Sequence, residues 1–239
     1  MTTFTDIHNH SLFNLDDGAK TEQEMYAMIE ASYRDGVRTL CLTPHFHPGY
    51  FGDNHQERDV VFRFLKGYVK EHYPDMQIFL GNELRYSRDC LSWLAEGYCL
   101  TMNRTRYVLV DFSEKEPDYA ISKGLDRLLN AGYIPILAHA ERYRELSRGQ
   151  IQEFRQNGVL IQVDAQSLLM GFGLRVQHRC KGILAEHLAD MVSSDAHDLS
   201  GRPPQLGTCF QYIENKYGAE YARELCQENA WNVCGCISR

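Results

Sequence analysis

Short runs of consecutive apolar residues recur along the chain and predict the strands of a parallel sheet. We expect these strands at residues 5–9, 39–43, 77–80, 106–112, 134–138, 159–164 and 190–194. Most of the runs are continuous rather than alternating, which is typical of strands that are buried on both faces. The pattern therefore predicts a buried sheet.

Segments with helical patterning and recognisable ends separate the strands. Thr21-Glu22-Gln23-Glu24 is a capping box that begins a helix lasting to about Asp35, and Gly36 ends it. Further helices are expected at residues 59–73, 119–131, 150–157, 174–186 and 204–229. Strands that alternate with helices indicate a parallel sheet, and this number of units predicts an α/β barrel one unit short of the eight-stranded form.

Length and charge narrow the class of protein. The chain has 239 residues without a repeat or linker-like tract, so we expect a single domain spanning residues 1–239. Its net charge of −7 argues against a nucleic-acid partner or an anionic membrane surface, because either would need a basic face. No apolar run approaches the roughly 18 residues of a spanning helix, and the N-terminus lacks the features of a signal peptide. We expect a cytoplasmic protein without membrane insertion.

The cysteines do not indicate a disulfide framework. All 8 are scattered along a chain that is large enough to fold without disulfides. Cys234-Gly235-Cys236 could bind a metal, but a reduced, frayed tail is the favoured interpretation.

Histidines and carboxylates follow most of the predicted strands. The segments are Asp6-Ile7-His8-Asn9-His10, Asp16-Asp17-Gly18, Thr43-Pro44-His45, Gly81-Asn82-Glu83, Val110-Asp111-Phe112, Ala138-His139-Ala140 and Ser194-Asp195-Ala196-His197. In a barrel of parallel strands the chemistry belongs at the carboxyl ends, where these residues would meet. A two-residue spacing such as His8-x-His10 puts both rings on one face of a strand.

This set of side chains predicts a site for more than one metal ion. A single His-x-His is more often chance or core packing than a ligand pair. Several buried carboxylates together, however, cost several kcal/mol unless they meet cations. Mixed imidazole and carboxylate ligands suit Zn²⁺, Mn²⁺ or Fe²⁺, whereas Ca²⁺ prefers oxygen ligands alone.

In this order, the segments resemble the PHP (polymerase and histidinol phosphatase) superfamily, which has a distorted (β/α)7 TIM-like barrel and three metal ions. Asp16-Asp17-Gly18-Ala19-Lys20-Thr21 and Ala138-His139-Ala140-Glu141-Arg142-Tyr143 look like one branch in particular. That branch is the manganese-dependent protein-tyrosine phosphatases of bacterial capsular and exopolysaccharide operons. The resemblance extends from residue 3 to about residue 230 and includes Arg202-Pro203-Pro204.

The resemblance implies three divalent metal ions, with Mn²⁺ expected and Fe²⁺ or Zn²⁺ as alternatives. The ligands would be His8, His10, Glu83 and Asp195 for the first ion, Glu83, Asp111 and His139 for the second, and Asp17, His45 and His197 for the third. Asp16 is an alternative to Asp17. Asp111 departs from the branch, which often has glutamate there, and the shorter side chain predicts weaker binding or a bridging water.

Arg142 and Arg202 match arginines that grip the substrate phosphate, and Asp195 and His197 are expected to take part in catalysis. From local sequence alone, Arg142 would sooner pair with Glu141 or Glu145 on a helix surface. The resemblance implies direct attack by a metal-bridging hydroxide, because bound metals lower the pKa of water and neutralise phosphoryl oxygens. No cysteine has the spacing to an arginine that cysteine-dependent tyrosine phosphatases need: four or six residues separate Cys99 from Arg104 and Arg106.

The expected substrate is a phosphotyrosyl protein, specifically the C-terminal tail of a bacterial tyrosine kinase that regulates polysaccharide synthesis. Two other functions stay open. One is another phosphoesterase of the superfamily, such as a histidinol-phosphatase or a small-molecule phosphatase, with its preference set by the loops at residues 46–56 and 112–118. The other is a metal-bound regulator without catalytic activity. The sequence leaves the oligomeric state open.

Overall fold

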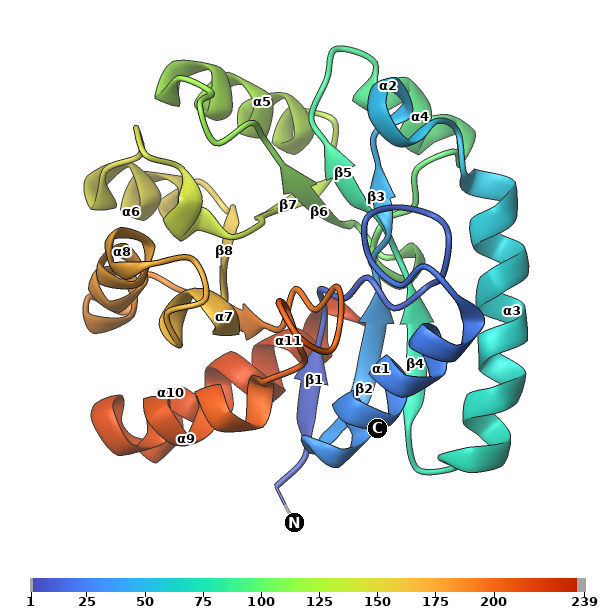
Figure 1. The fold of residues 1–239 in the computed structure, drawn as a ribbon. Helices are drawn as coiled ribbons and strands as arrows, with labels where there is room; N and C mark the ends of the chain where they lie inside the picture. Colours follow the sequence, from blue (N-terminus) through green and yellow to red (C-terminus); the bar gives the residue numbers. More distant parts are fainter. Residues whose placement is uncertain (1, 236–239) are drawn as a thin grey trace.

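Parallel strands form the inner layer of the molecule and helices cover its outside (Figure 1). The computed structural model describes residues 2–235. Its strands are β1 (Phe4–Asp6), β2 (Val37–Leu42), β3 (His45–Phe46), β4 (Gln77–Leu80), β5 (Glu83–Arg85), β6 (Tyr107–Asp111), β7 (Ile134–Leu137), β8 (Leu160–Asp164) and β9 (Met191–Ser193). Every strand pairing within these residues is parallel, as the continuous apolar runs predict.

Two of the predicted strands are followed, after a break, by a short second strand. Thr43-Pro44 separates β2 from β3, and Gly81-Asn82 separates β4 from β5, so His45 and Glu83 begin short second strands. A proline has no N–H to donate to a ladder, which accounts for the break before His45. The broken strands stay side by side, because Gly81 N donates to Leu42 O at 2.9 Å and Glu83 N donates to Thr43 O at 3.3 Å.

The sheet curls until its first and last strands meet. Beyond β1 and β9, Asp195 N donates to His8 O and His10 N donates to Ala196 O, both at 2.9 Å. β5 pairs with β6, but β4 and β6 do not pair within the described residues, and the 3₁₀-helix η1 (Met102–Arg104) contacts both. The curled parallel sheet confirms the expected α/β class with a distorted barrel.

Most of the α-helices lie between strands along the chain, and the last three follow β9. They are α1 (Glu22–Arg34), α2 (Pro48–Phe51), α3 (His55–His72), α4 (Cys90–Glu96), α5 (Asp118–Asn130), α6 (Arg148–Gln156), α7 (Ala165–Leu168), α8 (Leu174–Ala185), α9 (Leu206–Tyr217), α10 (Ala219–Arg223) and α11 (Asn229–Val233). A second 3₁₀-helix, η2 (Ala140–Arg142), follows β7, and a π-helical turn, η3 (Glu224–Glu228), precedes α11.

Local sequence explains how several helices begin and end. Half of the predicted capping box is present at α1, where Thr21 Oγ1 accepts from Glu24 N at 3.2 Å. The Glu24 side chain accepts instead from the backbone N–H of Lys20 at 2.6 Å, one residue before the N-cap. The prediction of one helix over residues 204–229 is wrong. Gly218, with a φ of 100°, separates α9 from α10, and only glycine adopts that conformation without strain.

Apolar residues fill the barrel below its mouth. One cluster of buried side chains lies inside the curled sheet and includes Ile7, Cys41, Leu109, Ile136 and Met191. A larger cluster lies between the sheet and the surrounding helices. Because the interior is packed, polar side chains at the carboxyl ends of the strands can meet only at the mouth.

The described cysteines are buried. The expectation of a frayed tail is wrong at Cys234, which lies directly after α11, is buried and accepts from Asn103 Nδ2 through its backbone oxygen at 2.7 Å. Cys236 lies outside the described residues. No helix within residues 2–235 combines the length and the apolar character needed to cross a membrane.

Candidate metal centre

All nine predicted metal ligands lie at the mouth of the barrel. His45 begins β3, Glu83 begins β5 and Asp111 ends β6. The other ligands lie in the segments that follow strands: His8, His10 and Asp17 after β1, His139 after β7, and Asp195 and His197 after β9. Most of these side chains are buried, and only Asp17 is exposed, with 52% of its side chain accessible. The structure thus brings together residues that lie up to 189 positions apart.

The first group of side chains contains two imidazoles and two carboxylates. Nε2 of His8 and Nε2 of His10 lie 3.1 Å apart. Glu83 Oε2 lies 3.2 Å from the His8 nitrogen and 3.4 Å from the His10 nitrogen. Asp195 Oδ1 lies 3.3 and 3.4 Å from the same two nitrogens. These four atoms therefore surround one small volume.

The second group shares Glu83 with the first. Glu83 Oε1 lies 2.9 Å from Nε2 of His139, and Asp111 Oδ1 lies 3.7 Å from the same nitrogen. One carboxylate thus faces two neighbouring sites with its two oxygens, which is the arrangement of a bridging ligand. The longer distance from Asp111 agrees with its short side chain.

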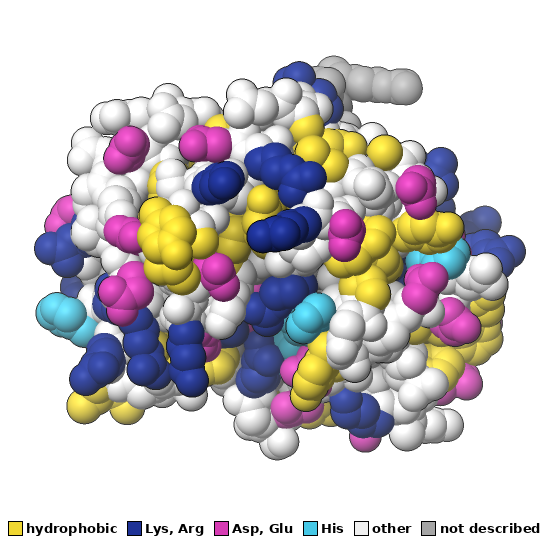
Figure 2. All heavy atoms as spheres, turned by 90° about the horizontal axis from the view of Figure 1, so that it is seen from above, with side chains coloured by type: hydrophobic (Ala, Val, Ile, Leu, Met, Phe, Trp, Pro, Cys, Tyr) yellow, Lys and Arg dark blue, Asp and Glu magenta, His cyan; other side chains and the backbone are white. Residues whose placement is uncertain are grey.

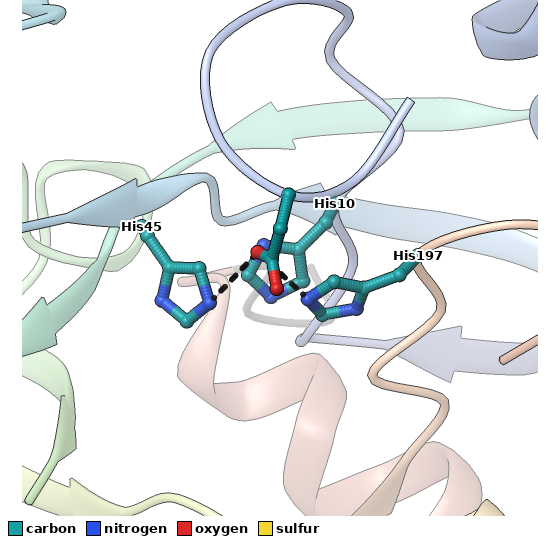
Figure 3. Close-up of side chains that lie close together, drawn as sticks. His10, His45 and His197 are labelled. Carbon is teal, nitrogen blue, oxygen red and sulfur yellow. Dashed lines mark ion pairs between the residues drawn. The ribbon is translucent and has the colours of Figure 1, made fainter. Parts of the chain in front are cut away.

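The third group consists of Asp17, His45 and His197, with His10 beside it (Figure 3). Asp17 Oδ1 lies 3.3 Å from Nε2 of His45 and 3.4 Å from Nε2 of His197. Asp16 takes another position, because its Oδ2 accepts from Nδ1 of His10 and from the backbone N–H of His45, each at 2.8 Å. Of the two aspartates, Asp17 therefore faces the group of imidazoles and Asp16 supports it from behind.

The spacing of these atoms fits divalent ions. Ligand atoms about 2.1 Å from one ion lie roughly 3.0–3.4 Å from each other, and most distances within the three groups fall in this range. Glu83 Oε2 is buried among nitrogens of three imidazoles, with Nε2 of His8 at 3.2 Å, Nε2 of His10 at 3.4 Å and Nδ1 of His45 at 2.8 Å. A buried carboxylate oxygen among several imidazole nitrogens is placed to share a cation with them. The donor set of nitrogen and carboxylate oxygen suits Mn²⁺, Fe²⁺ or Zn²⁺.

Neighbouring groups fix which imidazole nitrogen faces each site. Nδ1 of His8 donates to Gln162 Oε1 at 3.3 Å, and Nδ1 of His197 donates to the backbone oxygen of Asp195 at 2.9 Å. With Nδ1 engaged in this way, Nε2 is left as the coordinating atom. The same holds for His10, whose Nδ1 donates to Asp16.

The electrostatics of the site favour cations. Burial, reinforced by the charge of Glu83, raises the pKa of Asp111 to about 7. Burial, with the charge of Arg142, lowers the pKa of His139 to about 4, and burial beside His10 lowers the pKa of His197 to about 4. Both rings are therefore neutral at pH 7, as metal coordination requires. Asp111 resists ionisation beside the carboxylate of Glu83, which indicates that the site is built to receive the positive charge of bound cations.

Two of the ligand residues have strained backbones. His139 has a φ of 36° and Asp195 a φ of 50°, in the left-handed region that residues with a side chain rarely adopt. Each lies two residues beyond a strand end, β7 or β9, at the mouth. Strain of this kind persists where the surrounding structure holds it, and it concentrates at functional sites.

Arg142, at the end of η2, and Arg202, in the loop beyond β9, both reach the site. Arg142 Nη2 contacts Asp195 Oδ2 at 2.7 Å and also pairs with Asp164, while Arg202 pairs with the same oxygen of Asp195. Both guanidinium groups line a cavity of about 150 Å³ that also exposes Glu83, Asp111 and His139. The prediction from local sequence that Arg142 lies on a helix surface is wrong, because only 11% of its side chain is accessible.

Sequence reasoning missed several residues around the site. Gln162 bonds the ring of His8, and its amide nitrogen donates to Asp164 Oδ1 at 2.7 Å. Phe172 stacks on Arg142, with 3.9 Å between the guanidinium carbon and the ring centre. Asp164 ends a predicted strand, so the strand-end rule could have found it. Neither Gln162 nor Phe172 has a signal of its own in the sequence.

The segment at residues 46–56 packs against one of the metal groups. Phe51 of α2 stacks on the ring of His45, with 5.3 Å between ring centres and 11° between ring planes. His47 stacks on Tyr50 rather than facing the metal groups. Tyr50 itself is 76% exposed and packs edge-on against Phe51, with 4.8 Å between ring centres.

Comparisons with known proteins agree with this site. Residues 4–234 match the family model described as "Capsular polysaccharide synthesis, CpsB/CapC". The tyrosine-protein phosphatase CpsB of Streptococcus agalactiae serotype III is 33% identical over 95% of this chain and 97% of its own length. The tyrosine-protein phosphatase YwqE of Bacillus subtilis is 31% identical over 94% of this chain and 89% of its own length.

A solved structure is similar over nearly the whole chain. It belongs to a set described as YwqE from Bacillus subtilis and CpsB from Streptococcus pneumoniae, "unique metal-dependent tyrosine phosphatases". Its TM-score is 0.88 at 28% sequence identity, and the similarity covers 98% of this chain and 95% of that one.

Proposed function

The chain belongs to the capsular polysaccharide synthesis family CpsB/CapC, and from that premise we propose that it is a metal-dependent tyrosine-protein phosphatase with its active site at the barrel mouth. The observation that carries the proposal is the convergence of five imidazoles and four carboxylates on three adjoining sites. A protein that only bound a phosphorylated tail would have no need of so many ligands.

Each group of side chains would hold one ion. His8, His10, Glu83 and Asp195 would hold the first, Glu83, Asp111 and His139 the second, and Asp17, His45 and His197 the third. We propose Mn²⁺, with Fe²⁺ and Zn²⁺ as the alternatives that the donor set also suits. When bound, the ions would supply positive charge for the phosphoryl oxygens and would lower the pKa of a coordinated water.

The arginines would bind and orient the phosphate. Arg142 and Arg202 present forked donors that match phosphoryl oxygens, and both are already held near the metal groups by Asp195. The substrate phosphate would thus lie between the guanidinium groups and the ligands of the barrel. Fixed donors at this position stabilise the charge of the transferring phosphoryl group without reorganisation.

Hydrolysis would proceed by direct attack of water on phosphorus. The bond between phosphorus and the tyrosine oxygen breaks, and the phenolate leaves as a moderately good leaving group. No described cysteine is available as a nucleophile. The thiol of Cys99, for example, is buried, and burial raises its pKa well above the usual value, so it stays protonated. A covalent phosphocysteine is therefore not part of the proposal.

We propose that the substrate is a phosphotyrosyl protein, in particular the C-terminal tail of a bacterial tyrosine kinase that regulates capsular polysaccharide synthesis. We propose further that the protein acts in the cytoplasm. We also propose that residues 1–239 form a single domain. The family assignment supports the link to polysaccharide synthesis. The small cavity supports a substrate that inserts only its phosphate and keeps its remaining atoms at the mouth.

A substrate panel tests the proposal. The purified protein with Mn²⁺ is assayed on phosphotyrosyl peptides, phosphoseryl peptides, histidinol phosphate and nucleotides. We expect the highest kcat/KM on the phosphotyrosyl peptides. Turnover of histidinol phosphate that is faster by orders of magnitude would instead assign the site to small-molecule hydrolysis.

A further inference from the structure

Three arginines, not two, line the cavity at the barrel mouth. Arg85 lies in its wall together with Arg142 and Arg202. In all three side chains the Nε atom is buried and has no hydrogen-bond partner within residues 2–235. A buried N–H group without a partner is rare in folded proteins, and three around one cavity indicate a ligand rich in oxygen acceptors.

Arg85 approaches the cavity from a different side than the other two. It ends β5, whereas Arg142 follows β7 and Arg202 follows β9, so the strand β6 lies between Arg85 and Arg142 in the sheet. Lysine and arginine side chains gather across the middle of the face seen from above in Figure 2. An anion in the cavity would therefore meet guanidinium groups on opposite sides.

Asp111 holds Arg85 in place. The two residues are partners in the register of β5 and β6, and Arg85 Nη2 lies 2.7 Å from Asp111 Oδ2. About 31% of the Arg85 side chain remains accessible, so the contact with Asp111 does not occupy the whole guanidinium group. Arg202 is held in the same way, by an ion pair between its Nη2 and the carboxylate of Asp195.

We propose that Arg85 is a third arginine that binds the phosphoryl group of the substrate, an inference that rests on the proposed function. Asp111 orients its guanidinium group in the wall of the cavity. A phosphoryl group has three oxygens, so it can accept from Arg85 on one side and from Arg142 and Arg202 on the other. Arg85 is then a catalytic residue that touches the substrate.

Binding of inorganic phosphate tests this proposal directly. The Mn²⁺-loaded protein and its variants Arg85→Gln, Arg85→Lys and Arg142→Gln are titrated with phosphate by calorimetry, and their metal content is measured in parallel. Arg88→Gln is the matched control, because Arg88 is an exposed arginine just beyond β5. The KM of each protein is measured for p-nitrophenyl phosphate and for a phosphotyrosyl peptide.

We expect Arg85→Gln to weaken phosphate binding roughly ten- to a hundredfold, the effect of losing charge-assisted hydrogen bonds. The KM for both substrates should rise with it, at unchanged metal content. Arg85→Lys should be intermediate, because it keeps the charge and loses the fork. Arg88→Gln should leave all values unchanged.

Three outcomes would overturn the proposal. Phosphate affinity in Arg85→Gln equal to that of the unmodified protein would show that Arg85 does not touch the phosphate. A rise in KM confined to the peptide would show that it binds another part of the substrate. Loss of metal together with phosphate would show that it acts through Asp111. In each case Arg142→Gln should still weaken phosphate binding. Unchanged phosphate affinity in Arg142→Gln as well would count against the proposed function.

Discussion

Asp16 accepts a hydrogen bond from Nδ1 of His10 at 2.8 Å and so turns the opposite ring nitrogen toward the metal groups. The same carboxylate accepts the backbone N–H of His45, which lies 29 residues further along the chain. One buried side chain thus orients ligands of two adjoining sites. This places Asp16 behind the ligands, where a carboxylate increases the basicity of the imidazole that it contacts.

Asp16→Asn should weaken metal binding while leaving the fold intact. The asparagine keeps the volume but cannot accept with both oxygens, so the His10 ring loses its fixed tautomer. We expect Mn²⁺ affinity to fall by about 10- to 100-fold, measured by calorimetry on the metal-free protein. Asp126→Asn, on the exposed face of α5, is the control and should bind as before. Equal affinity in the two variants would contradict the role given to Asp16.

Asp111→Glu should strengthen the second metal site. Asp111 Oδ1 lies 3.7 Å from Nε2 of His139, compared with 2.9 Å for Glu83 Oε1, and one more methylene would bring the carboxylate nearer. We expect the Mn²⁺ concentration for half-maximal phosphotyrosyl-peptide hydrolysis to fall several-fold, with Asp126→Glu as the control. A higher concentration requirement would show that the shorter acid is the better ligand in this chain.

Asn82→Ala should destabilise the fold through the break between β4 and β5. Its amide is fully buried, donates to Pro44 O at 2.8 Å and accepts from the buried Arg58 at 2.6 Å. Removal leaves Arg58 without this acceptor, and we expect a loss of about 2–4 kcal/mol in the free energy of unfolding. Urea denaturation measures this change in the free energy of unfolding. Asn130→Ala, at the exposed end of α5, should change stability by less than about 0.5 kcal/mol. A similar small change for Asn82→Ala would refute the argument.

Asp35→Asn should change how stability depends on pH. The Asp35 carboxylate accepts from Gly207 N at the start of α9, and burial, reinforced by the charge of Asp6, raises its pKa to about 6 from 3.8. Between these values the folded protein holds the proton more tightly than the unfolded chain. Ionisation of Asp35 therefore lowers stability as the pH rises through this range.

The asparagine variant lacks this penalty. Its Tm relative to the unmodified protein should increase between pH 4 and pH 8, as thermal unfolding at several pH values would show. A difference in Tm that stays constant over the range would contradict the raised pKa.

Much of the site could be predicted because its ligands follow a simple rule. His8 and His10 stand two positions apart after an apolar run, and Asp195 and His197 repeat the spacing after the last strand. The same rule applied to Glu83 would have reached Arg85, which the sequence reasoning passed over. Parallel strands bring such residues together whatever their separation in the chain.

The remaining features depend on contacts that local sequence does not encode. Gln162 lies within a strand, and only the folded sheet shows that its amide reaches His8 and Asp164. The break before His45 was visible in Pro44, but its length depends on the pairing of β3 with β5. Gly218 ends α9 through its backbone conformation, although the surrounding residues favour a longer helix.

Metal analysis of the purified protein, alongside phosphotyrosyl-peptide hydrolysis by the unmodified chain and by His8→Ala, tests the central claim most directly. We expect about three equivalents of a divalent metal such as Mn²⁺ in the unmodified protein. His8→Ala should lose metal and nearly all activity while its circular dichroism spectrum stays the same. Undiminished hydrolysis by a chelated, metal-free protein, or by His8→Ala, would contradict the account.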